Sequence, residues 1–324
     1  MPSRFKRIQI IVNPAAGRQR PVLSILNRVF KQYGDITWDV SITNRRGDGR
    51  RLAREAVAQG ADVVAAYGGD GTVMEVAAGL VGSDVPLAIL PGGTGNVMAA
   101  ELGIPRRLRL SARLLCEKNQ LRMLDMGRIG EHYFLMRASV GFEAKVIEKT
   151  SREMKDRFGL LAYGISIMQT LTEPLAAHYH LTIDGQPVES EGVSLLIANA
   201  GSIGRLNLSL AVTIEPDDGL LDVLIINNDP NSVLSMAASV IRLPELAASL
   251  QYWKAREVAI TADPPQNVQV DGELLGQTPI TATVAPGAIR VVVPERPFSW
   301  LGTIAGQREH SSESTQDAYT DESA

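Results

Sequence analysis

The fold of this chain follows from ADVVAAYGGDGTVMEVAAGLVGSDVPLAILPGGTGNVMAA, residues 61–100. In this stretch an apolar, strand-like run enters a glycine turn and then a helical segment, and the same order follows a second time. Alternation of strand and helix is typical of a parallel sheet with helices on both of its faces. Residues 61–100 therefore predict an α/β domain.

The same alternation extends back to the N-terminus. Strand-like runs at residues 7–14 and 37–43 alternate with helical segments at residues 21–34 and 49–60. Both helical segments end at a glycine, which is a common helix stop. We expect residues 1–127 to form one α/β domain with a parallel sheet.

The pattern changes after about residue 125. Short apolar runs now follow one another, separated by Gly, Pro, Asn and Asp, which is typical of an antiparallel β domain. We expect residues 128–294 to form this β-rich domain, with the acidic, serine-rich residues 307–324 as a disordered tail. The runs cover residues 132–139, 178–184, 193–200, 221–227, 257–262, 267–272, 279–284 and 289–294; helices are expected near 144–172 and 232–250, and loops at 186–187 and 263–265.

Length and charge limit the possible partners. The chain has 324 residues, enough for about two domains of ~100–200 residues each. Residues 307–324 hold one arginine and five acids, so they account for the formal net charge of −4 and leave 31 basic and 31 acidic groups in residues 1–306. This balance of charge in residues 1–306 does not indicate a nucleic-acid partner. Residues 1–60 differ, because twelve Lys/Arg face four Asp/Glu; this excess predicts either a solvated basic face or attraction to phosphate, on a ligand or on an anionic membrane surface.

Cysteine content and hydropathy indicate the compartment. The single cysteine, Cys116, excludes an internal disulfide framework and a multi-cysteine metal site, and it fits a reducing cytosol. We see no signal-peptide pattern, and the uncharged residues 158–172 are too few and too polar to span a bilayer. We therefore expect a cytoplasmic protein that is soluble or peripherally attached to a membrane.

The strongest local motif is the glycine turn at residues 67–72, YGGDGT, between a buried strand and a helix. Its three glycines allow a tight turn and a close approach of the backbone to a bulky anion, and the helix start offers unpaired N–H groups that suit phosphate. Thr72 can cap the helix or contact a phosphate oxygen. Asp70 repels phosphate unless Mg²⁺ lies between them. The alternative is a purely structural turn.

Two more loops of this kind make a purely structural turn less attractive. Residues 91–96, PGGTGN, follow the next buried strand, and residues 13–17, NPAAG, follow the first one. Loops at the carboxyl ends of neighbouring strands line one crevice, which is where open α/β sheets bind ligands. Neither a Walker A sequence nor the dinucleotide-binding Gly-x-Gly-x-x-Gly is present.

With these motifs the chain resembles the diacylglycerol kinase and sphingosine kinase superfamily, and more closely its bacterial soluble lipid kinases. NPAAG, GGDGT and PGGTGN occur in the family's order, and the later PDDGLLDV and VDGE match as well, so the resemblance covers roughly residues 6–300. It implies an N-terminal α/β nucleotide-binding domain, a β-rich lipid-binding domain with the active site between them, and a return of residues 295–306 onto the first domain.

The resemblance also implies which residues bind ATP. Two positions depart from the family pattern: Met74 stands where the family often has Asn, and Val97 where many diacylglycerol kinases have Asp. The second departure weakens diacylglycerol as the specific acceptor but not a lipid kinase. The implied nucleotide residues are Asn13, Pro14, Gly17, Thr43, Gly68, Gly69, Asp70, Gly71, Thr72, Glu75, Gly93, Thr94 and Asn96.

A cation site is implied at the acidic turn 217–219, which by itself reads as a plain Asx turn. By resemblance the Asp218 carboxylate and the backbone carbonyls of Glu215 and Leu220 hold a structural Mg²⁺. Asp125 resembles the family aspartate that joins Asp70 in a water-linked Mg²⁺ network.

The residue that accepts a proton is implied at VDGE, residues 270–273. Asp271-Gly272 is the favoured pair of a hairpin turn, which explains both residues but not Glu273. In the family the acid at the position of Glu273 accepts the proton of the lipid hydroxyl as the γ-phosphoryl group moves. Asp271, two positions away, is the competing candidate, since alternation along a strand places both side chains on one face.

These observations predict an ATP- and Mg²⁺-dependent lipid kinase with Glu273, Asp70 and Asp125 as catalytic residues. The expected acceptor is diacylglycerol, which would give phosphatidic acid. An NAD kinase-like enzyme and a non-catalytic lipid-binding protein on the same fold are the alternatives. The expected partners are ATP, a lipid, an anionic membrane surface and a second copy of the chain.

Overall fold

The structure of this chain is a computed structural model that describes residues 5–17, 21–34, 36–141, 176–200, 202–203, 208–209, 214–227 and 250–296. The helix expected near residues 144–172, most of the one near 232–250 and the tail 307–324 lie outside these ranges. Within them, no helix combines the length and the apolar character needed to cross a membrane.

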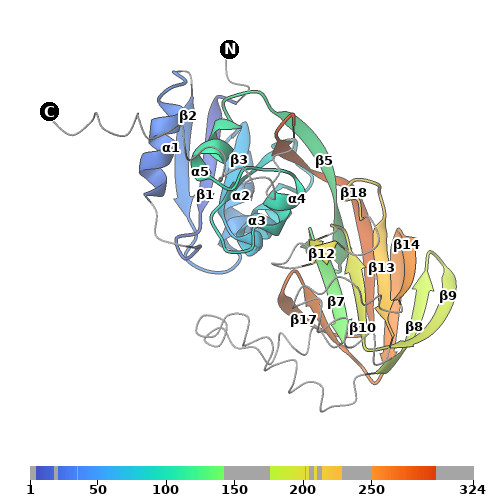
Figure 1. Ribbon diagram of the computed structural model, residues 1–324. Helices are drawn as coiled ribbons and strands as arrows, with labels where there is room; N and C mark the ends of the chain where they lie inside the picture. The colour runs from blue at the N-terminus through green and yellow to red at the C-terminus, as the bar shows by residue number, and fades with distance from the viewer. Residues whose placement is uncertain are drawn as a thin grey trace, which may run out of the picture.

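The first part of the chain is an α/β layer (Figure 1). Four parallel strands pair in the order β2-β1-β3-β4, so the predicted parallel sheet is confirmed. Its elements are β1 (Arg7–Val12), α1 (Val22–Phe30), β2 (Thr37–Ile42), α2 (Asp48–Ala58), β3 (Val63–Gly68), α3 (Asp70–Leu80), β4 (Leu87–Pro91), α4 (Val97–Glu101) and α5 (Leu108–Arg113).

Both faces of this sheet are covered because its strands are apolar on both sides. In β3, Val63 and Ala65 pack with α1 and α5, whereas Val64 and Ala66 pack with α2 and α3. Successive side chains of a strand point to opposite faces, so one continuous apolar run serves two cores. The carboxyl ends of the strands stay uncovered by these cores, and the glycine loops begin there.

The second part is a β sandwich (Figure 1); the antiparallel β domain was predicted, and its two packed sheets were not. One sheet is antiparallel in the order β14-β13-β10-β7-β16-β17 and packs through a shared apolar core on β8 and β15 of the other sheet. The strands are β5 (Gln120–Ile129), β6 (His132–Phe134), β7 (Arg137–Gly141), β8 (Ala177–Ile183), β9 (Gln186–Gly192), β10 (Ser194–Ala198), β11 (Ser202–Ile203), β12 (Leu208–Ser209), β13 (Leu221–Ile226), β14 (Leu250–Ala255), β15 (Glu257–Asp263), β16 (Asn267–Val270), β17 (Glu273–Gln277) and β18 (Ile280–Val293).

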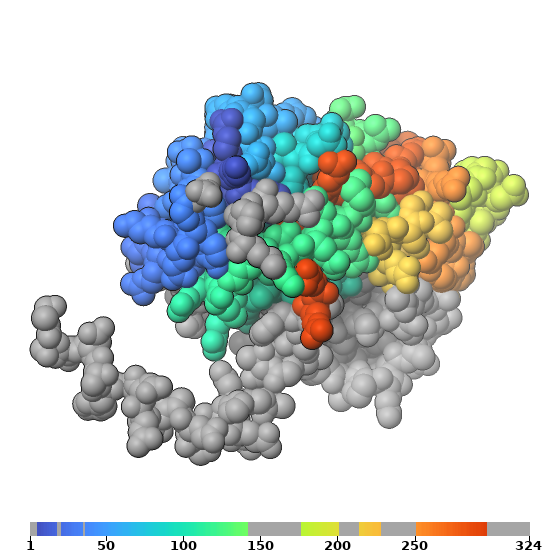
Figure 2. All heavy atoms as spheres, turned by 90° about the horizontal axis from the view of Figure 1, so that it is seen from above, coloured from blue at the N-terminus to red at the C-terminus, as the bar shows by residue number. Residues whose placement is uncertain are grey.

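Strands β5 and β18 join the two parts. Strand β18 pairs antiparallel with β5 and β15, and its end reaches the parallel sheet, where Val291 is the partner of Leu87 in β4. The sheet of the first part therefore continues into the sandwich. Figure 2 shows the green and red-orange residues of this junction between the blue first part and the yellow to orange second part. The chain thus returns to the first part through β18; residues 297–306, part of the expected return, lie outside the described ranges.

Three local expectations were wrong. Residues 186–187, expected as a loop, begin β9, and the turn lies two residues earlier, at Asp184-Gly185. Pro187 is tolerated because β9 is an edge strand. One side of an edge strand pairs with no other strand, so a residue without an N–H can be accepted there. The apolar runs 279–284 and 289–294 form one strand, β18, with a register shift between Ala285 and Ile289. Leu250, expected in a helix, begins β14.

Candidate active site

Three glycine loops meet at the carboxyl ends of β1, β3 and β4. A Cβ on Gly93 would collide with the backbone of Gly69, and one on Gly17 would collide with the carbonyl of Gly92. Gly17 also has a φ of 69°, which L side chains rarely adopt. The Gly68 carbonyl accepts the N–H groups of Gly92 (2.9 Å) and Gly93 (3.0 Å), and the loops are therefore held in backbone-to-backbone contact.

A cavity of about 990 Å³ opens above these loops and is closed on its far side by the β16–β17 hairpin. Its volume lies at the upper end of the ~300–1,000 Å³ typical of small-molecule sites.

The sheet edge gathers residues from four segments of the first part, as expected from parallel strands. Of the predicted site residues, Asn13, Pro14, Gly17, Thr43, Gly69, Gly71, Thr72, Glu75, Gly93, Thr94 and Glu273 line this cavity.

Several cavity residues were not among the predicted site residues, and two arginines and a leucine among them add charge and an apolar group to the rim. Arg45 and Arg46 line it together with Leu274. A signal for the arginines was present, because they follow Thr43 at the carboxyl end of β2, the same sheet edge as the glycine loops. No local signal marks Leu274, which reaches the cavity only through the pairing of β16 with β17.

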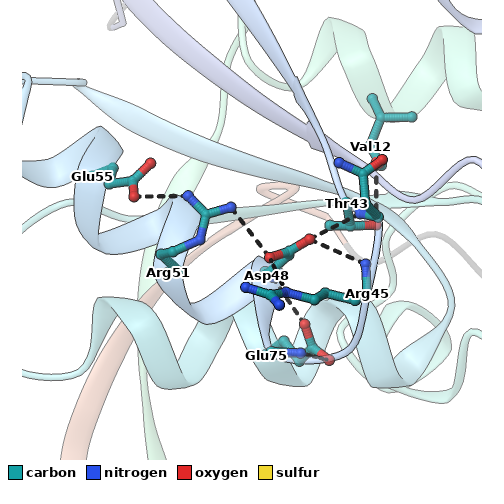
Figure 3. Close-up of polar contacts among 10 residues, drawn as sticks. Val12, Thr43, Arg45, Asp48, Arg51, Glu55 and Glu75 are labelled. Carbon is teal, nitrogen blue, oxygen red and sulfur yellow. Dashed lines mark hydrogen bonds and ion pairs between the residues drawn. The ribbon is translucent and has the colours of Figure 1, made fainter.

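The loop that carries these arginines is held by two carboxylates (Figure 3). Asp48 accepts the N–H groups of Asn44 (2.9 Å) and Arg45 (3.1 Å), and these bonds keep the pKa of Asp48 below its ordinary value. Glu75 accepts the N–H groups of Gly47 and Gly49, both at 2.9 Å. Glu75 therefore positions the start of α2 in addition to lining the cavity.

Asp70 and Asn96 support the loops from outside the cavity lining. The Asp70 carboxylate accepts the N–H of Met98 (3.3 Å) at the start of α4, and burial raises its pKa against the opposing effect of the amides of residues 96–98. Asn96 lies in the left-handed region, with its Oδ1 accepting the Gly93 N–H and its Nδ2 donating to the Gly93 carbonyl. Together they hold the PGGTGN loop against α3. Gly68 ends β3 below the cavity lining.

The β16–β17 hairpin gives its two acids different surroundings. Asp271 and Gly272 have positive φ angles of 45° and 92°, so they form the expected two-residue turn. The Asp271 carboxylate accepts three successive N–H groups, from Leu135 (2.9 Å), Met136 (3.2 Å) and Arg137 (2.9 Å). Asp271 is thus tied to the backbone of the neighbouring segment, and the hairpin is anchored by it.

Glu273 is the acid of this hairpin that lines the 990 Å³ cavity. Its side chain is 52% exposed and forms an ion pair with Arg46, which comes from the first part of the chain. An exposed acid at the rim can exchange partners at little cost, whereas Asp271 would lose three hydrogen bonds. The geometry therefore favours Glu273 over Asp271 as an acid available to a ligand.

Asp271→Asn is expected to flatten the pH dependence of stability. Burial raises the pKa of Asp271 from 3.8 to about 6, despite the three N–H donors. The folded state thus binds a proton more tightly than the unfolded state, so the free energy of unfolding falls as pH rises through this interval and levels off above it. Thermal unfolding of wild type and variant at several pH values measures the difference. Identical slopes between pH 4 and 6 would contradict the assignment.

The acidic turn 216–220 lies at the junction of the two parts. Asp125, which is buried, accepts the N–H groups of Gly219 and Gly287, both at 2.6 Å. Both of its oxygens are engaged, so the visible contribution of Asp125 is to hold two turns together. Asp217 forms a bidentate ion pair with Arg122 at 2.7 and 2.8 Å.

Asp218 is already paired with the positively charged side chain of Lys254. Its Oδ1 accepts the Leu220 N–H (3.0 Å), which makes the Asx turn, and its Oδ2 lies 2.6 Å from Lys254 Nζ. Among the described residues, no three His, Cys, Asp or Glu side chains converge as a metal site would require. An ion at this turn would therefore rely on one carboxylate and on backbone carbonyls such as those of Glu215 and Leu220.

Comparisons with known proteins place these features in context. Residues 7–129 match the family model described as "Diacylglycerol kinase catalytic domain", and residues 136–293 match "YegS C-terminal NAD kinase beta sandwich-like domain". A protein of Staphylococcus aureus (strain Mu3) named "Putative lipid kinase" is 29% identical over 263 residues, covering 78% of this chain and 85% of that protein.

Two other relatives extend the comparison. "Uncharacterized protein sll0036" of Synechocystis (PCC 6803) is 29% identical over 272 residues, covering 82% of this chain, which spans about 60% of the length of that protein. The crystal structure of a diacylglycerol kinase from Bacillus anthracis superposes with a TM-score of 0.73 at 24% identity, covering 90% of this chain and 99% of that one. This last likeness shows a shared fold.

Proposed function

From its membership of two families, we propose that this chain is an ATP-dependent lipid kinase. Residues 7–129 belong to the family of the diacylglycerol kinase catalytic domain, and residues 136–293 belong to the family of the YegS C-terminal domain. The observation that carries the proposal is the position of Glu273. It is an exposed carboxylate at the rim of a glycine-lined cavity large enough for a nucleotide. The acceptor we propose is diacylglycerol, with phosphatidic acid as the product.

In this proposal ATP occupies the 990 Å³ cavity. Backbone N–H groups of the loops bind its phosphates, because the glycines leave no side chains in the way. Thr43 and Thr94 line the same cavity and supply hydroxyl groups.

Glu273 accepts the proton of the acceptor hydroxyl during transfer. The hydroxyl oxygen forms a bond to the γ-phosphorus while the bond from that phosphorus to the bridging oxygen breaks, and ADP leaves. Proton acceptance contributes part of the rate, and positioning with charge neutralisation contributes the rest. Asp70 acts as a positioning residue, since it holds the Met98 N–H next to the loop that carries Gly93 and Thr94 into the cavity. Asp125 holds the Gly219 and Gly287 N–H groups and positions the two turns at the junction of the two parts.

Mg²⁺ is the cofactor that we propose. The oxygen donors at the acidic turn, the Asp218 carboxylate and the carbonyls of Glu215 and Leu220, are of the kind that a hard cation prefers. Lys254 Nζ lies 2.6 Å from Asp218 Oδ2, so a metal ion bound there would displace this ammonium group. When bound, Mg²⁺ supplies charge that stabilises the turn or the phosphates.

Competition between Lys254 and Mg²⁺ can be measured. Lys254→Met is expected to enlarge the rise in melting temperature that Mg²⁺ produces, and Asp218→Ala to remove it. Binding to the native state alone stabilises by mass action, about 2.7 kcal/mol at 100 times the Kd. Arg122→Met is the matched control, because Arg122 pairs with the neighbouring Asp217. An equal rise in wild type and Asp218→Ala would place the ion elsewhere.

A panel of acceptors tests the function. Purified protein is incubated with labelled ATP and diacylglycerol, monoacylglycerol, ceramide, sphingosine, phosphatidylglycerol or NAD. Label in a lipid supports the proposal. Label in NAD alone overturns it in favour of an NAD kinase activity, which is the alternative suggested by the words "NAD kinase" in the description of the second family. Binding of lipid without any turnover of ATP would indicate a non-catalytic lipid-binding protein.

Location and assembly complete the proposal. We propose that the enzyme is cytoplasmic and meets its lipid at an anionic membrane surface. Several arginines of residues 1–60 are already paired within the protein: Arg45 and Arg51 with Asp48, and Arg46 with Glu273. A homodimer is a further proposal, which size-exclusion chromatography with light scattering tests.

A further inference from the structure

A second cavity, of about 230 Å³, lies beside the first and shares Glu273, Leu274 and Arg46 with it. Met74, Tyr133 and Leu275 give this second cavity an apolar wall. Its volume is below the ~300–1,000 Å³ of sites that enclose a whole small molecule. It can therefore receive the polar end of an acceptor lipid, but not its acyl chains as well.

Leu274 stands at the rim that the two cavities share. It is 51% exposed and is one of four large apolar side chains with high exposure among the described residues. It belongs to β17, the edge strand of the six-stranded sheet, whose residues are exposed or half-buried throughout. Asp271 ties the hairpin to residues 135–137, so the position of this leucine is set by the sandwich.

The exposed charges around Leu274 are mainly positive. The side chains of Arg45 and Arg46 are 84% and 66% exposed, and both line the first cavity. The acids nearby have partners: Asp48 and Glu75 accept backbone N–H groups, and Asp271 accepts three more. Arg45 lies 3.7 Å from Asp48, and Arg46 pairs with Glu273, so Arg46 contacts a head group only after Glu273 exchanges this partner. An exposed leucine beside exposed arginines is complementary to an anionic lipid surface, which offers hydrocarbon below and phosphate above.

We propose that the tip of the β16–β17 hairpin docks on an anionic lipid surface, with Leu274 entering the bilayer interface and Arg45 and Arg46 contacting head groups. This inference rests on the proposed lipid kinase function and identifies where that enzyme meets its substrate. Docking brings the lipid surface to Glu273. The acceptor hydroxyl then enters the 230 Å³ cavity while its acyl chains remain in the bilayer.

Leu274→Ser tests the docking surface. Full burial of a leucine is worth about 1.5–3 kcal/mol, so partition onto vesicles of phosphatidylcholine and phosphatidylserine is expected to fall by about 10- to 100-fold. Leu23→Ser is the matched control, because Leu23 is 53% exposed, lies on α1 and lines neither cavity. Arg45→Gln is expected to weaken binding severalfold at low salt and less at high salt, since screening shortens the attraction.

Activity measurements separate docking from catalysis. Each variant is assayed with diacylglycerol in the vesicles and with a short-chain diacylglycerol dissolved below its critical micelle concentration. The ratio of kcat/KM for the vesicle acceptor to that for the dissolved acceptor is expected to fall about 10- to 100-fold in Leu274→Ser and to stay constant in Leu23→Ser.

Three results would overturn the docking surface. These are wild-type vesicle binding by Leu274→Ser, equal losses on dissolved and vesicle acceptors, and loss of a dimer with unchanged vesicle binding, which would assign the edge strand to a second copy of the chain. Failure of the proposed function is distinguishable, because wild type would then phosphorylate neither acceptor while vesicle sedimentation still reports on docking.

Discussion

Glu273→Gln is expected to lower turnover by ~10²–10⁴-fold with ATP binding nearly unchanged, since positioned general bases typically contribute that much. The substitution keeps the shape of the side chain and removes its ability to accept a proton. Most of the cavity lining comes from the first part of the chain, so the nucleotide contacts remain. Single-turnover rates with labelled ATP and equilibrium binding of an ATP analogue measure the two effects separately.

Asp271→Asn is the comparison for this experiment. Its carboxylate is occupied by the amides of residues 135–137, so the variant is expected to change stability more than the chemical step. An inactive Asp271→Asn beside an active Glu273→Gln would reverse the assignment. Activity of both variants at the wild-type level would remove the hairpin from the mechanism.

Asp70→Ala is expected to reduce phosphoryl transfer by ~10²-fold or more and to leave the protein folded. The Asp70 carboxylate holds the start of α4 through the Met98 N–H, and with it the loop that carries Gly93 and Thr94 into the cavity. Displacement of catalytic groups by about 1 Å is enough for a loss of ~10²-fold. Steady-state kinetics at saturating Mg²⁺ measure the loss, and circular dichroism confirms the fold.

Asp70→Asn separates the two roles considered for Asp70. Asparagine keeps an oxygen that can accept the Met98 N–H but carries no charge. If Asp70 acts by positioning, Asp70→Asn retains much more activity than Asp70→Ala; if its charge acts on Mg²⁺-bound phosphate, both variants are equally impaired. Near-normal activity of Asp70→Ala would exclude both roles.

Much of the fold could be predicted because it depends on local patterns. Alternating strands and helices with glycine turns specify a parallel sheet, and short apolar runs between turn residues specify an antiparallel β domain. The errors fell where neighbours decide the outcome. Pro187 reads as a loop signal until the strand is known to be an edge, and the runs on either side of Gly287 read as two strands until β5 pairs with both.

Part of the candidate site was predictable from local patterns, and part of it depends on tertiary contacts. The glycine loops were identifiable because a turn that admits only glycine leaves a mark in the sequence, and most of the predicted nucleotide residues do line one cavity. Leu274 leaves no such mark, since a leucine in a strand is ordinary. It becomes part of the site only because the hairpin of the sandwich faces the edge of the parallel sheet.

By itself the sequence determined that this protein has an α/β layer followed by an antiparallel β domain, with three glycine loops on one sheet edge. Those features depend on residues close together in the chain. The tertiary structure alone shows how the surroundings of Asp271 and Glu273 differ. The two acids lie two positions apart, and what separates them is contact with distant segments: the amides of residues 135–137 enclose Asp271, whereas Arg46 and an open cavity face Glu273. Burial and hydrogen bonding to remote backbone set the role of an acid, and neither is visible in its neighbours along the chain.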